Sequence, residues 1–411
     1  MADPGHGAAP SSGRSGAVVA LATVLLVVAV LAGAGLGHLA WPVHNAPTTA
    51  ASPTFNSPGG SGSSGAETFP FGSGSSGNSS TGAGAPSDIS SIAAKVAPGL
   101  VDINTNLSYQ NEQAAGTGMV ISPSGVVLTN NHVIQGATSI SVTDVGNGKT
   151  YKGTVIGYDR TSDVAVVKLS GASGLQTVSV SDQKASVGQA VVGVGNAGGT
   201  GGTPSSAGGS VTAVDQAITA SDSGGGNAEN LTGLIEINAA IQPGDSGGSL
   251  VNTQGGVIGM DTAASAGSGY QVSGSQAYAI PIATALSLAR QIEGGKASST
   301  VHIGETGFLG VSVESSGGSG GSGGFGGFGS GNAQASGATV ASVVSGSPAE
   351  KAGLAQGDVI TALNGTAISS PSDLTGLLEP DHPGDTVQLQ WTDGSGQQQT
   401  ATVTLASGPP A

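Results

Sequence analysis

The stretch Gly244-Asp245-Ser246-Gly247-Gly248 sets a serine among glycines. Glycines let the backbone turn tightly, so that consecutive N–H groups can point at one spot, where the oxyanion of a tetrahedral intermediate develops. We therefore expect Ser246 to be a nucleophile and the N–H groups of Gly244 and Ser246 to be its oxyanion donors.

A serine nucleophile needs a histidine to take its proton and a carboxylate to orient that histidine. Two upstream segments supply these groups: Leu128-Thr129-Asn130-Asn131-His132-Val133-Ile134 and Ser162-Asp163-Val164-Ala165-Val166-Val167. Alone, His132 could be a packed histidine and Asp163 a turn cap. Together with Ser246 they predict a catalytic triad, in which His132 is the base and Asp163 orients it.

The order of these residues along the chain distinguishes two folds that share the pattern Gly-x-Ser-x-Gly. In α/β-hydrolases the serine precedes its acid and its histidine. After Ser246 the only histidines are His302 and His382, and neither has the surroundings of a base. The order His132, Asp163, Ser246 is that of the chymotrypsin-like fold.

The pattern around these segments indicates mostly β structure. Apolar residues at helical spacing predict a helix near 89–96, and Pro98-Gly99 ends it before a strand at 100–103. Short β-rich runs separated by turn residues come next, which is typical of barrels or a sandwich. A helix is predicted over 282–292, closed by Gly294-Gly295.

A second β-containing unit begins near Gly307 and is interrupted by a glycine-serine insertion over 315–337. Helix starts are indicated by Ser347-Pro348-Ala349-Glu350 and Ser370-Pro371-Ser372-Asp373, each with an N-cap serine, a proline and an acidic residue at the third position. The segment Phe308-Leu309-Gly310-Val311 is similar to the loop with which PDZ domains bind a peptide carboxylate.

From Ser87 to Leu405 the chain resembles the HtrA/Deg family of proteases. The matching segments are 116–121, 128–133, 163–169, 239–241 with 244–248, 257–259 and 279–281, and then 346–354, 357–360 and 363–365 of the PDZ-like unit. The resemblance implies a chymotrypsin-like double β-barrel at 87–297 and a small α+β PDZ domain at 303–406. It also implies the triad His132, Asp163 and Ser246, oxyanion donors at Gly244 and Ser246, and a homotrimer.

The activity that the resemblance implies is that of a serine endopeptidase that cleaves unfolded or misassembled extracytoplasmic proteins, with C-terminal peptides bound at Phe308 to Val311. The alternative is a protease that is inactive at rest and acts mainly as a peptide-binding module or chaperone. In chymotrypsin-like enzymes the residue six before the nucleophile forms the floor of the specificity pocket, which is Ala240 here, and Asp261 would line a wall. An uncharged floor favours small or medium apolar substrate side chains.

The N-terminal region is expected to hold the protease at a membrane. The uncharged apolar run from Gly16 to Gly37 is long enough to cross about 30 Å of hydrocarbon. We expect a cytoplasmic tail at 1–15, a single-pass signal anchor at 16–41 and a disordered linker at 42–86, with the rest extracytoplasmic. Cleavage after Ala32-Gly33-Ala34, as in a signal peptide, is the alternative.

The composition excludes other classes of function. The formal net charge of −15 offers no basic stripe for phosphates, so no nucleic-acid partner is expected. The chain has no cysteine, which excludes a disulfide framework and a thiolate metal site. Neither a metal nor a cofactor is expected.

Overall fold

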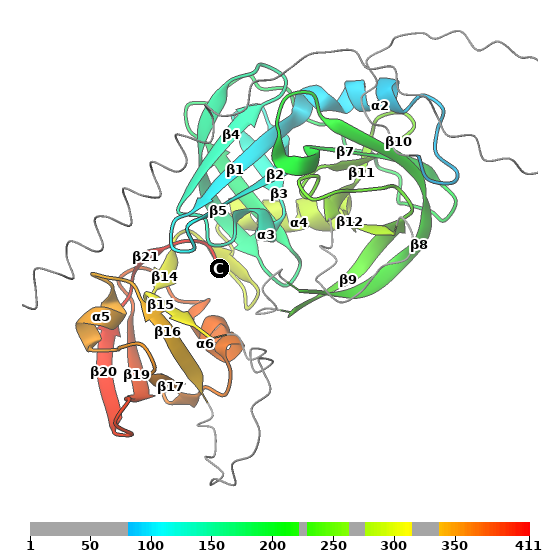
Figure 1. Cartoon of the computed structure of the whole chain (residues 1–411). Helices are drawn as coiled ribbons and strands as arrows, with labels where there is room; N and C mark the ends of the chain where they lie inside the picture. The colour runs from blue at the N-terminus through cyan, green and yellow to red at the C-terminus, as the bar shows by residue number, and fades with distance from the viewer. Residues whose placement is uncertain (1–80, 222–227, 263–275, 315–336) are drawn as a thin grey trace, which may run out of the picture. The chain divides into compact units, whose positions relative to one another are not determined.

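The structure is a computed structural model that describes residues 81–221, 228–262, 276–314 and 337–411 (Figure 1). The predicted tail, the predicted membrane anchor, most of the linker and nearly all of the insertion at 315–337 lie outside these residues. Within the described ranges, no helix has the length and hydrophobicity needed to span a membrane.

Helix α2 (Ile89–Val96) confirms the helix predicted from apolar spacing, because Ile89, Ile92, Ala93 and Val96 are its buried residues. It leads through a 3-10 turn, η1 (Ala97–Gly99), into the first strand. The proline in that turn cannot continue the α-helical hydrogen bonding, and the chain becomes extended at Leu100.

The first half of the protease fold is an antiparallel sheet in the order β13-β5-β4-β1-β2-β3-β6, in which β5 also pairs with β6 and so joins the sheet to itself. The strands are β1 (Leu100–Leu107), β2 (Glu112–Ser122), β3 (Val126–Thr129), β4 (Ser139–Asp144), β5 (Thr150–Asp159), β6 (Val164–Leu169) and β13 (Val301–Ile303). The short helix α3 (Asn131–Ile134) follows β3 directly. A core that includes Ile103, Val127, Ile134 and Tyr158 fills this sheet.

The second half is a closed barrel in the order β10-β11-β12-β9-β8-β7. Its strands are β7 (Ala190–Gly195), β8 (Ser205–Ser221), β9 (Ala228–Ile237), β10 (Ser249–Asn252), β11 (Val257–Thr262) and β12 (Ala277–Pro281), with the turn η2 (Ala197–Gly199) between β7 and β8. Helix α4 (Ile282–Glu293) comes after β12 and is capped by Gly294 as expected. A core cluster that contains Ile92, Leu128, Met260 and Ile292 joins α2, both halves and α4.

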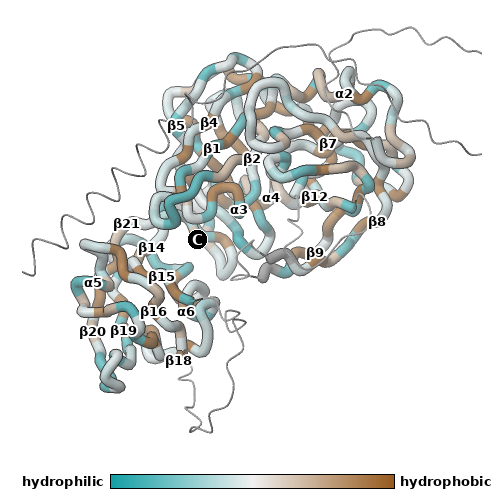
Figure 2. Tube along the Cα trace, viewed as in Figure 1, coloured by the Kyte–Doolittle hydropathy of each residue, from teal (hydrophilic) through white to brown (hydrophobic). Residues whose placement is uncertain are grey.

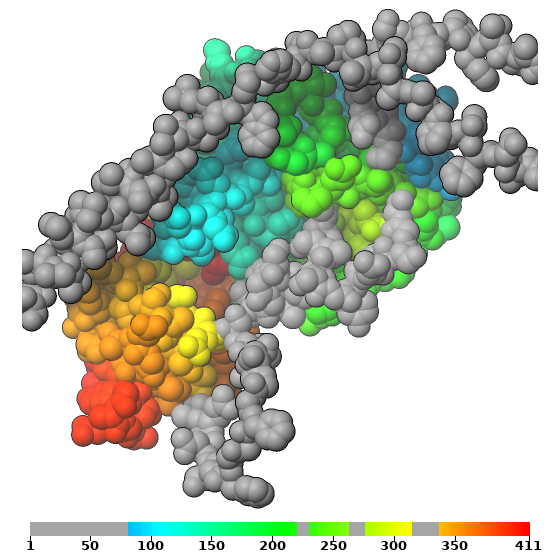
Figure 3. All heavy atoms as spheres, viewed as in Figure 1, coloured from blue at the N-terminus to red at the C-terminus, as the bar shows by residue number. Residues whose placement is uncertain are grey.

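The C-terminal unit packs two helices on a sheet around Trp391 and Leu389. Its strands are β14 (Thr306–Phe308), β15 (Val311–Val313), β16 (Ala338–Val343), β17 (Val359–Leu363), β18 (Thr366–Ala367), β19 (Thr386–Thr392), β20 (Gln398–Thr404) and β21 (Ala406–Gly408); its helices are α5 (Pro348–Ala352) and α6 (Pro371–Leu378). Figure 2 shows apolar stretches recurring along its strands, and Figure 3 shows its outer atoms in yellow to red.

Both predicted helix starts of this unit are confirmed. Ser347 accepts a hydrogen bond from the Glu350 N–H, and Ser370 forms a full capping box with Asp373. In the first motif the Glu350 carboxylate reaches the Gly346 N–H instead of its own N-cap, so that box is displaced by one residue.

Candidate active site

Two glycines fix the shape of the loop that carries Ser246. Gly244 has a φ of +98° and Gly247 a φ of +82°, values that side chains disfavour. A Cβ on Gly244 would lie 2.2 Å from the Asn196 carbonyl oxygen, and one on Gly247 would lie 2.1 Å from the Thr117 oxygen. The glycines are therefore required both for the turn and for its close packing against neighbouring backbone.

Thr117, on β2, holds this loop from the first half of the protease fold. Its hydroxyl donates to the Gly244 carbonyl (2.7 Å), and its backbone N–H donates to the Ser246 carbonyl (2.8 Å). The same hydroxyl accepts from the Asn196 N–H at 2.8 Å. Thr117 thus ties the residues on both sides of the turn to the opposite barrel.

Replacing Thr117 with valine is expected to lower kcat/KM about 10- to 100-fold. The change keeps the shape of the side chain but leaves the partly buried Gly244 carbonyl and the buried Asn196 N–H without this partner, at a cost of about 1–3 kcal/mol. Steady-state kinetics on a peptide substrate measures the effect. Thr117→Ser keeps the hydroxyl and should stay within about threefold of the wild type; equal activity of the valine variant would show that the hydroxyl does not position the loop.

The peptide between Pro243 and Gly244 has a defined direction. The Pro243 carbonyl accepts a 2.7 Å hydrogen bond from the Gly198 N–H in η2, and the described chain contains no cis peptide. In a trans peptide the N–H points opposite to the C=O. The Gly244 N–H is therefore directed away from η2, on the side of the peptide opposite to the Pro243 carbonyl.

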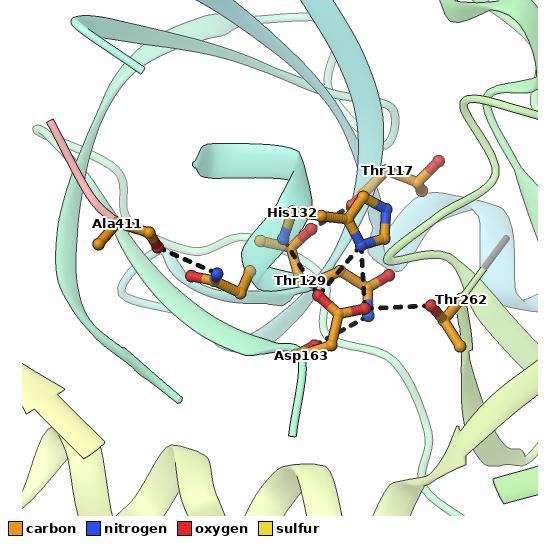
Figure 4. Close-up of polar contacts among 8 residues, drawn as sticks. Thr117, Thr129, His132, Asp163, Thr262 and Ala411 are labelled. Atoms are coloured by element: carbon orange, nitrogen blue, oxygen red, sulfur yellow. Dashed lines mark hydrogen bonds and ion pairs between the residues drawn. The ribbon is translucent and has the colours of Figure 1, made fainter. Parts of the chain in front are cut away.

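His132 and Asp163 lie in direct contact. His132 Nδ1 is 2.9 Å from Asp163 Oδ2 and 3.0 Å from Oδ1, and the His132 backbone N–H donates to Oδ1 at 3.1 Å (Figure 4). The Asp163 side chain is 1% exposed, whereas that of His132 is 33% exposed. A buried carboxylate thus orients a ring that remains accessible to a substrate.

Asp163 is held on its other sides by residues that sequence reasoning missed. Thr262, at the end of β11, donates to Asp163 Oδ2 at 3.0 Å, and the Asn130 side chain donates to the Asp163 carbonyl at 3.0 Å (Figure 4). Asp163 has a φ of +53°, a left-handed conformation that aspartate tolerates better than most residues. The only sequence signals were the nearness of Asn130 to His132 and of Thr262 to Asp261.

The Ser246 loop packs against the elements that carry His132. A Cβ on Gly116 would lie 2.7 Å from the Val133 methyl groups and 3.3 Å from the Ser246 carbonyl oxygen, so α3 and the loop meet at this glycine. A Cβ on Gly247 would lie 2.3 Å from the Thr129 hydroxyl oxygen, just before α3. Ser246 itself is 5% exposed. The structure brings the segments of His132, Asp163 and Ser246 to one place between the two barrels.

Asp245 stabilises the loop that carries Ser246 through hydrogen bonds of its side chain. Its Oδ2 accepts from the Gln242 N–H at 2.9 Å and its Oδ1 from the Ser205 hydroxyl at 2.7 Å. Burial raises the pKa of this carboxyl, while these hydrogen bonds act in the opposite direction. Asp245 therefore satisfies local donors, and the bond to Ser205 links the loop to β8.

The predicted pocket residues differ in exposure. Ala240 is partly exposed, whereas Asp261 is fully buried. Ile241, which was not expected at the pocket, lies beside Asp261: a Cβ on Gly193 would be 2.2 Å from Ile241 Cδ1 and 3.1 Å from Asp261 Oδ2. Any substrate side chain that approached Asp261 would meet Ile241 nearby. Within the described residues no group of acidic or histidine side chains is arranged to hold a metal ion.

The loop from Phe308 to Val311 joins β14 to β15. The Leu309 carbonyl accepts from the Ala349 N–H and the Gly310 carbonyl from the Val344 N–H, each at 2.9 Å. Gly310 has a φ of +88°, and a Cβ there would lie 2.2 Å from Ser347 Cβ. In the described part of the chain the Leu309 and Gly310 N–H groups donate to no acceptor.

Family models match both parts of the chain. The model of the trypsin-like peptidase domain matches residues 116–260, and that of the PDZ domain matches residues 307–405. The fold and these matches therefore define a trypsin-like peptidase domain followed by a C-terminal PDZ domain.

Named relatives place this architecture in a family. Serine protease PepD of Mycobacterium tuberculosis is 32% identical over 78% of this chain and 66% of its own length. The periplasmic pH-dependent serine endoprotease DegQ of Escherichia coli is 35% identical over 67% of this chain and 56% of its own length. The chain belongs to the HtrA/Deg family.

These matches cover part of each relative, about two thirds of PepD and just over half of DegQ. A solved structure of the HtrA-type protease AlgW with a tripeptide aligns with 79% of this chain and 98% of its own at 25% identity, with a TM-score of 0.43.

Proposed function

We propose that this chain is a serine endopeptidase that hydrolyses peptide bonds through an acyl-enzyme. Ser246 is the nucleophile, His132 is the general base, and Asp163 fixes the histidine tautomer in which Nδ1 carries the proton. The observation that carries the proposal is the contact of His132 Nδ1 with both oxygens of the buried Asp163 carboxylate, beside the Ser246 loop. With Nδ1 protonated, Nε2 is the ring nitrogen that accepts the serine proton.

In the proposed reaction Ser246 Oγ attacks the peptide carbonyl while its proton moves to His132 Nε2. The N–H groups of Gly244 and Ser246 receive the oxyanion, and the bond from Gly198 to the Pro243 carbonyl supports the direction required of Gly244. His132 then gives the proton to the leaving amine, and water hydrolyses the acyl-enzyme by the same steps.

The substrate class is inferred from the proposed pocket and the family. Ala240 provides an uncharged floor, and Ile241 next to Asp261 provides apolar surface, so small or medium apolar side chains are favoured. Substrates are proposed to be unfolded or misassembled extracytoplasmic proteins, since DegQ is described as periplasmic. The proposal also includes a protease domain at 87–297, a PDZ domain at 303–406, a membrane anchor at 16–41 and assembly into a homotrimer.

The PDZ domain is proposed to bind C-terminal peptides at residues 308–311. The Leu309 and Gly310 N–H groups have no acceptor in the described part of the chain, as a carboxylate-binding loop requires. Among the described strands β15 pairs with β16 alone, which leaves its other edge open to an added peptide strand.

Contacts from this domain reach the protease elements around His132. The Phe308 ring stacks on Tyr109, in the β1–β2 connection, with centroids 5.0 Å apart. The Asn131 side chain, beside His132, donates to the Ala411 oxygen at 3.1 Å (Figure 4). Peptide bound at Phe308 can therefore influence the protease through these contacts.

Tyr109→Ala is expected to weaken activation by a bound C-terminal peptide while leaving basal activity unchanged. Loss of one aromatic pair costs about 0.5–1.5 kcal/mol, so the ratio of kcat/KM with and without peptide should fall about two- to tenfold. Tyr109→Phe retains the ring and is the matched control. An unchanged ratio would exclude this stack from the coupling.

The proposed activity is tested on the full chain with an activated phosphonate ester and with denatured casein. We expect one covalent adduct per chain, mapped by mass spectrometry to Ser246, and loss of casein cleavage in step with labelling. Labelling at another residue would overturn the nucleophile assignment. A chain that binds casein or C-terminal peptides but neither cleaves nor labels would favour the alternative, a resting-inactive binding module or chaperone.

A further inference from the structure

Asp261 is a buried acid for which the proposed mechanism has no use. It is the penultimate residue of β11 and is 0% exposed. Neither carboxyl oxygen has a hydrogen-bond partner in the described part of the chain. Nearly all buried polar groups in proteins are hydrogen-bonded, so a carboxyl without any partner requires an explanation.

The carboxyl points into the interior of the second barrel. Side chains two residues apart on a strand share a face, and a Cβ on Gly259 would meet Ala279 and Ile235 of that barrel core. The neighbours from each packed element are Gly193 and the Val194 N–H on β7, Ala279 opposite on β12, and Ile241 and Asp245 in the loop before Ser246. Asp245 is the titratable group among these neighbours.

An ionised carboxylate is unfavourable in these surroundings. A charge without hydrogen bonds or a counter-ion costs several kcal/mol in an apolar interior, and the group takes up a proton instead. Burial first, and then repulsion from Asp245, raise the pKa of Asp261 well above its usual range. The Val194 N–H acts in the opposite direction, although it makes no hydrogen bond of normal geometry with the carboxyl.

The backbone of the same residue holds the proposed catalytic groups. The Asp261 N–H donates to the Gly248 carbonyl at 2.9 Å, and the Asp261 carbonyl accepts from the Gly247 N–H at 2.8 Å. The next residue, Thr262, donates to Asp163 Oδ2 at 3.0 Å. A movement of Asp261 would therefore disturb both the Ser246 loop and the orientation of Asp163.

We propose that Asp261 is a positioning residue that works as a neutral carboxylic acid, and that loss of its proton as the pH rises switches the protease off. The ionised form would repel Asp245 and draw water toward the barrel interior. Its backbone, which carries both hydrogen bonds to the Ser246 loop, would have to shift. This inference rests on the proposed protease function and adds an upper pH limit that the triad alone does not set.

The first test compares the pH dependence of kcat/KM of the full chain with that of Asp261→Asn. Asparagine has the shape of the neutral acid but cannot ionise. We expect the alkaline decline of the variant to move to higher pH or to disappear. The acidic decline should not move, because the substitution leaves the contact between His132 and Asp163 in place. Identical alkaline declines would overturn the inference.

Asp245→Asn provides a second variant that leaves Asp261 in place. The asparagine can still accept from the Gln242 N–H and bond to Ser205, but it removes the neighbouring charge. Asp261 should then ionise more readily, so the alkaline decline should move to lower pH, opposite to the effect of Asp261→Asn. A move to higher pH, or none, would contradict the pairing of these two acids.

Thermal unfolding supplies a readout that does not depend on activity. A carboxyl whose pKa in the folded chain exceeds its unfolded value of about 3.9 binds its proton more tightly when folded. Relative to Asp261→Asn, the chain with Asp261 should therefore lose stability as the pH rises from that value through the folded-state pKa. Measured in the Ser246→Ala background, the Tm difference should grow with pH and then level off. If the Tm difference is constant with pH, Asp261 is not a neutral acid in the folded chain, even if the protease function holds. If the Tm difference grows with pH but the chain with Ser246 shows no protease activity, the neutral state of Asp261 is supported and the proposed protease function fails.

Discussion

Ser246→Ala should lower kcat for a peptide substrate about a millionfold, to the limit of detection. The proposed mechanism has no other atom that can form the acyl-enzyme, and removal of a serine nucleophile typically removes nearly all the rate enhancement that the triad supplies. His132→Ala should cost about as much, and the double variant should lose little more, because the two residues act as one unit.

Ser249 provides a matched control for this experiment. It lies on β10, is fully buried, and its hydroxyl has no hydrogen-bond partner in the described part of the chain. Ser249→Ala therefore deletes the same atom nearby without removing a proposed catalytic group or leaving a partner unpaired, and its kcat should stay within about threefold of the wild type. Casein cleavage at equal rates by Ser246→Ala and the wild type would exclude Ser246 as the nucleophile. Persistent suppression of aggregation by Ser246→Ala would show that a chaperone function is separable from catalysis.

The features that sequence could predict are those fixed by neighbouring residues. The apolar spacing of Ile89, Ile92, Ala93 and Val96 predicted helix α2 because a helix repeats every 3.6 residues. The capping box of Ser370 and Asp373 could also be predicted from sequence, because both of its hydrogen bonds close within one helical turn. Two glycines of the Ser246 loop, Gly244 and Gly247, take positive φ angles, in agreement with the tight turn that their local pattern suggested.

Side-chain bonds between residues distant along the chain could not be predicted from sequence. Thr117 meets Gly244 across 127 positions, and Thr262 meets Asp163 across 99. Threonine is common on strands, and nothing in its immediate neighbours tells whether its hydroxyl faces solvent or a buried carboxylate such as that of Asp163. The burial of Asp261 could not be predicted from sequence either, because it depends on closure of the second barrel and on Ile241 lying beside it.

Asp163→Asn is expected to lower kcat about 10⁴-fold, because the substitution changes the hydrogen bonds that Asp163 makes with His132. The His132 backbone N–H donates to Oδ1, so the asparagine oxygen must take that position and its NH₂ group must replace Oδ2. The NH₂ would then face His132 Nδ1 across the present 2.9 Å contact. Nδ1 would have to become the acceptor, the ring proton would move to Nε2, and Nε2 could no longer take the proton of Ser246.

The pH dependence of kcat between about pH 6 and 10 separates this tautomer effect from simple loss of packing. Thr262→Val removes the hydroxyl that donates to Asp163 Oδ2 but leaves the carboxylate on His132. It should therefore cost only about tenfold. Asp163→Asn should cost far more at pH 7 and recover part of its activity at alkaline pH, where hydroxide can take over the role of the base. A loss of less than about tenfold for Asp163→Asn would mean that Asp163 does not set the tautomer of His132.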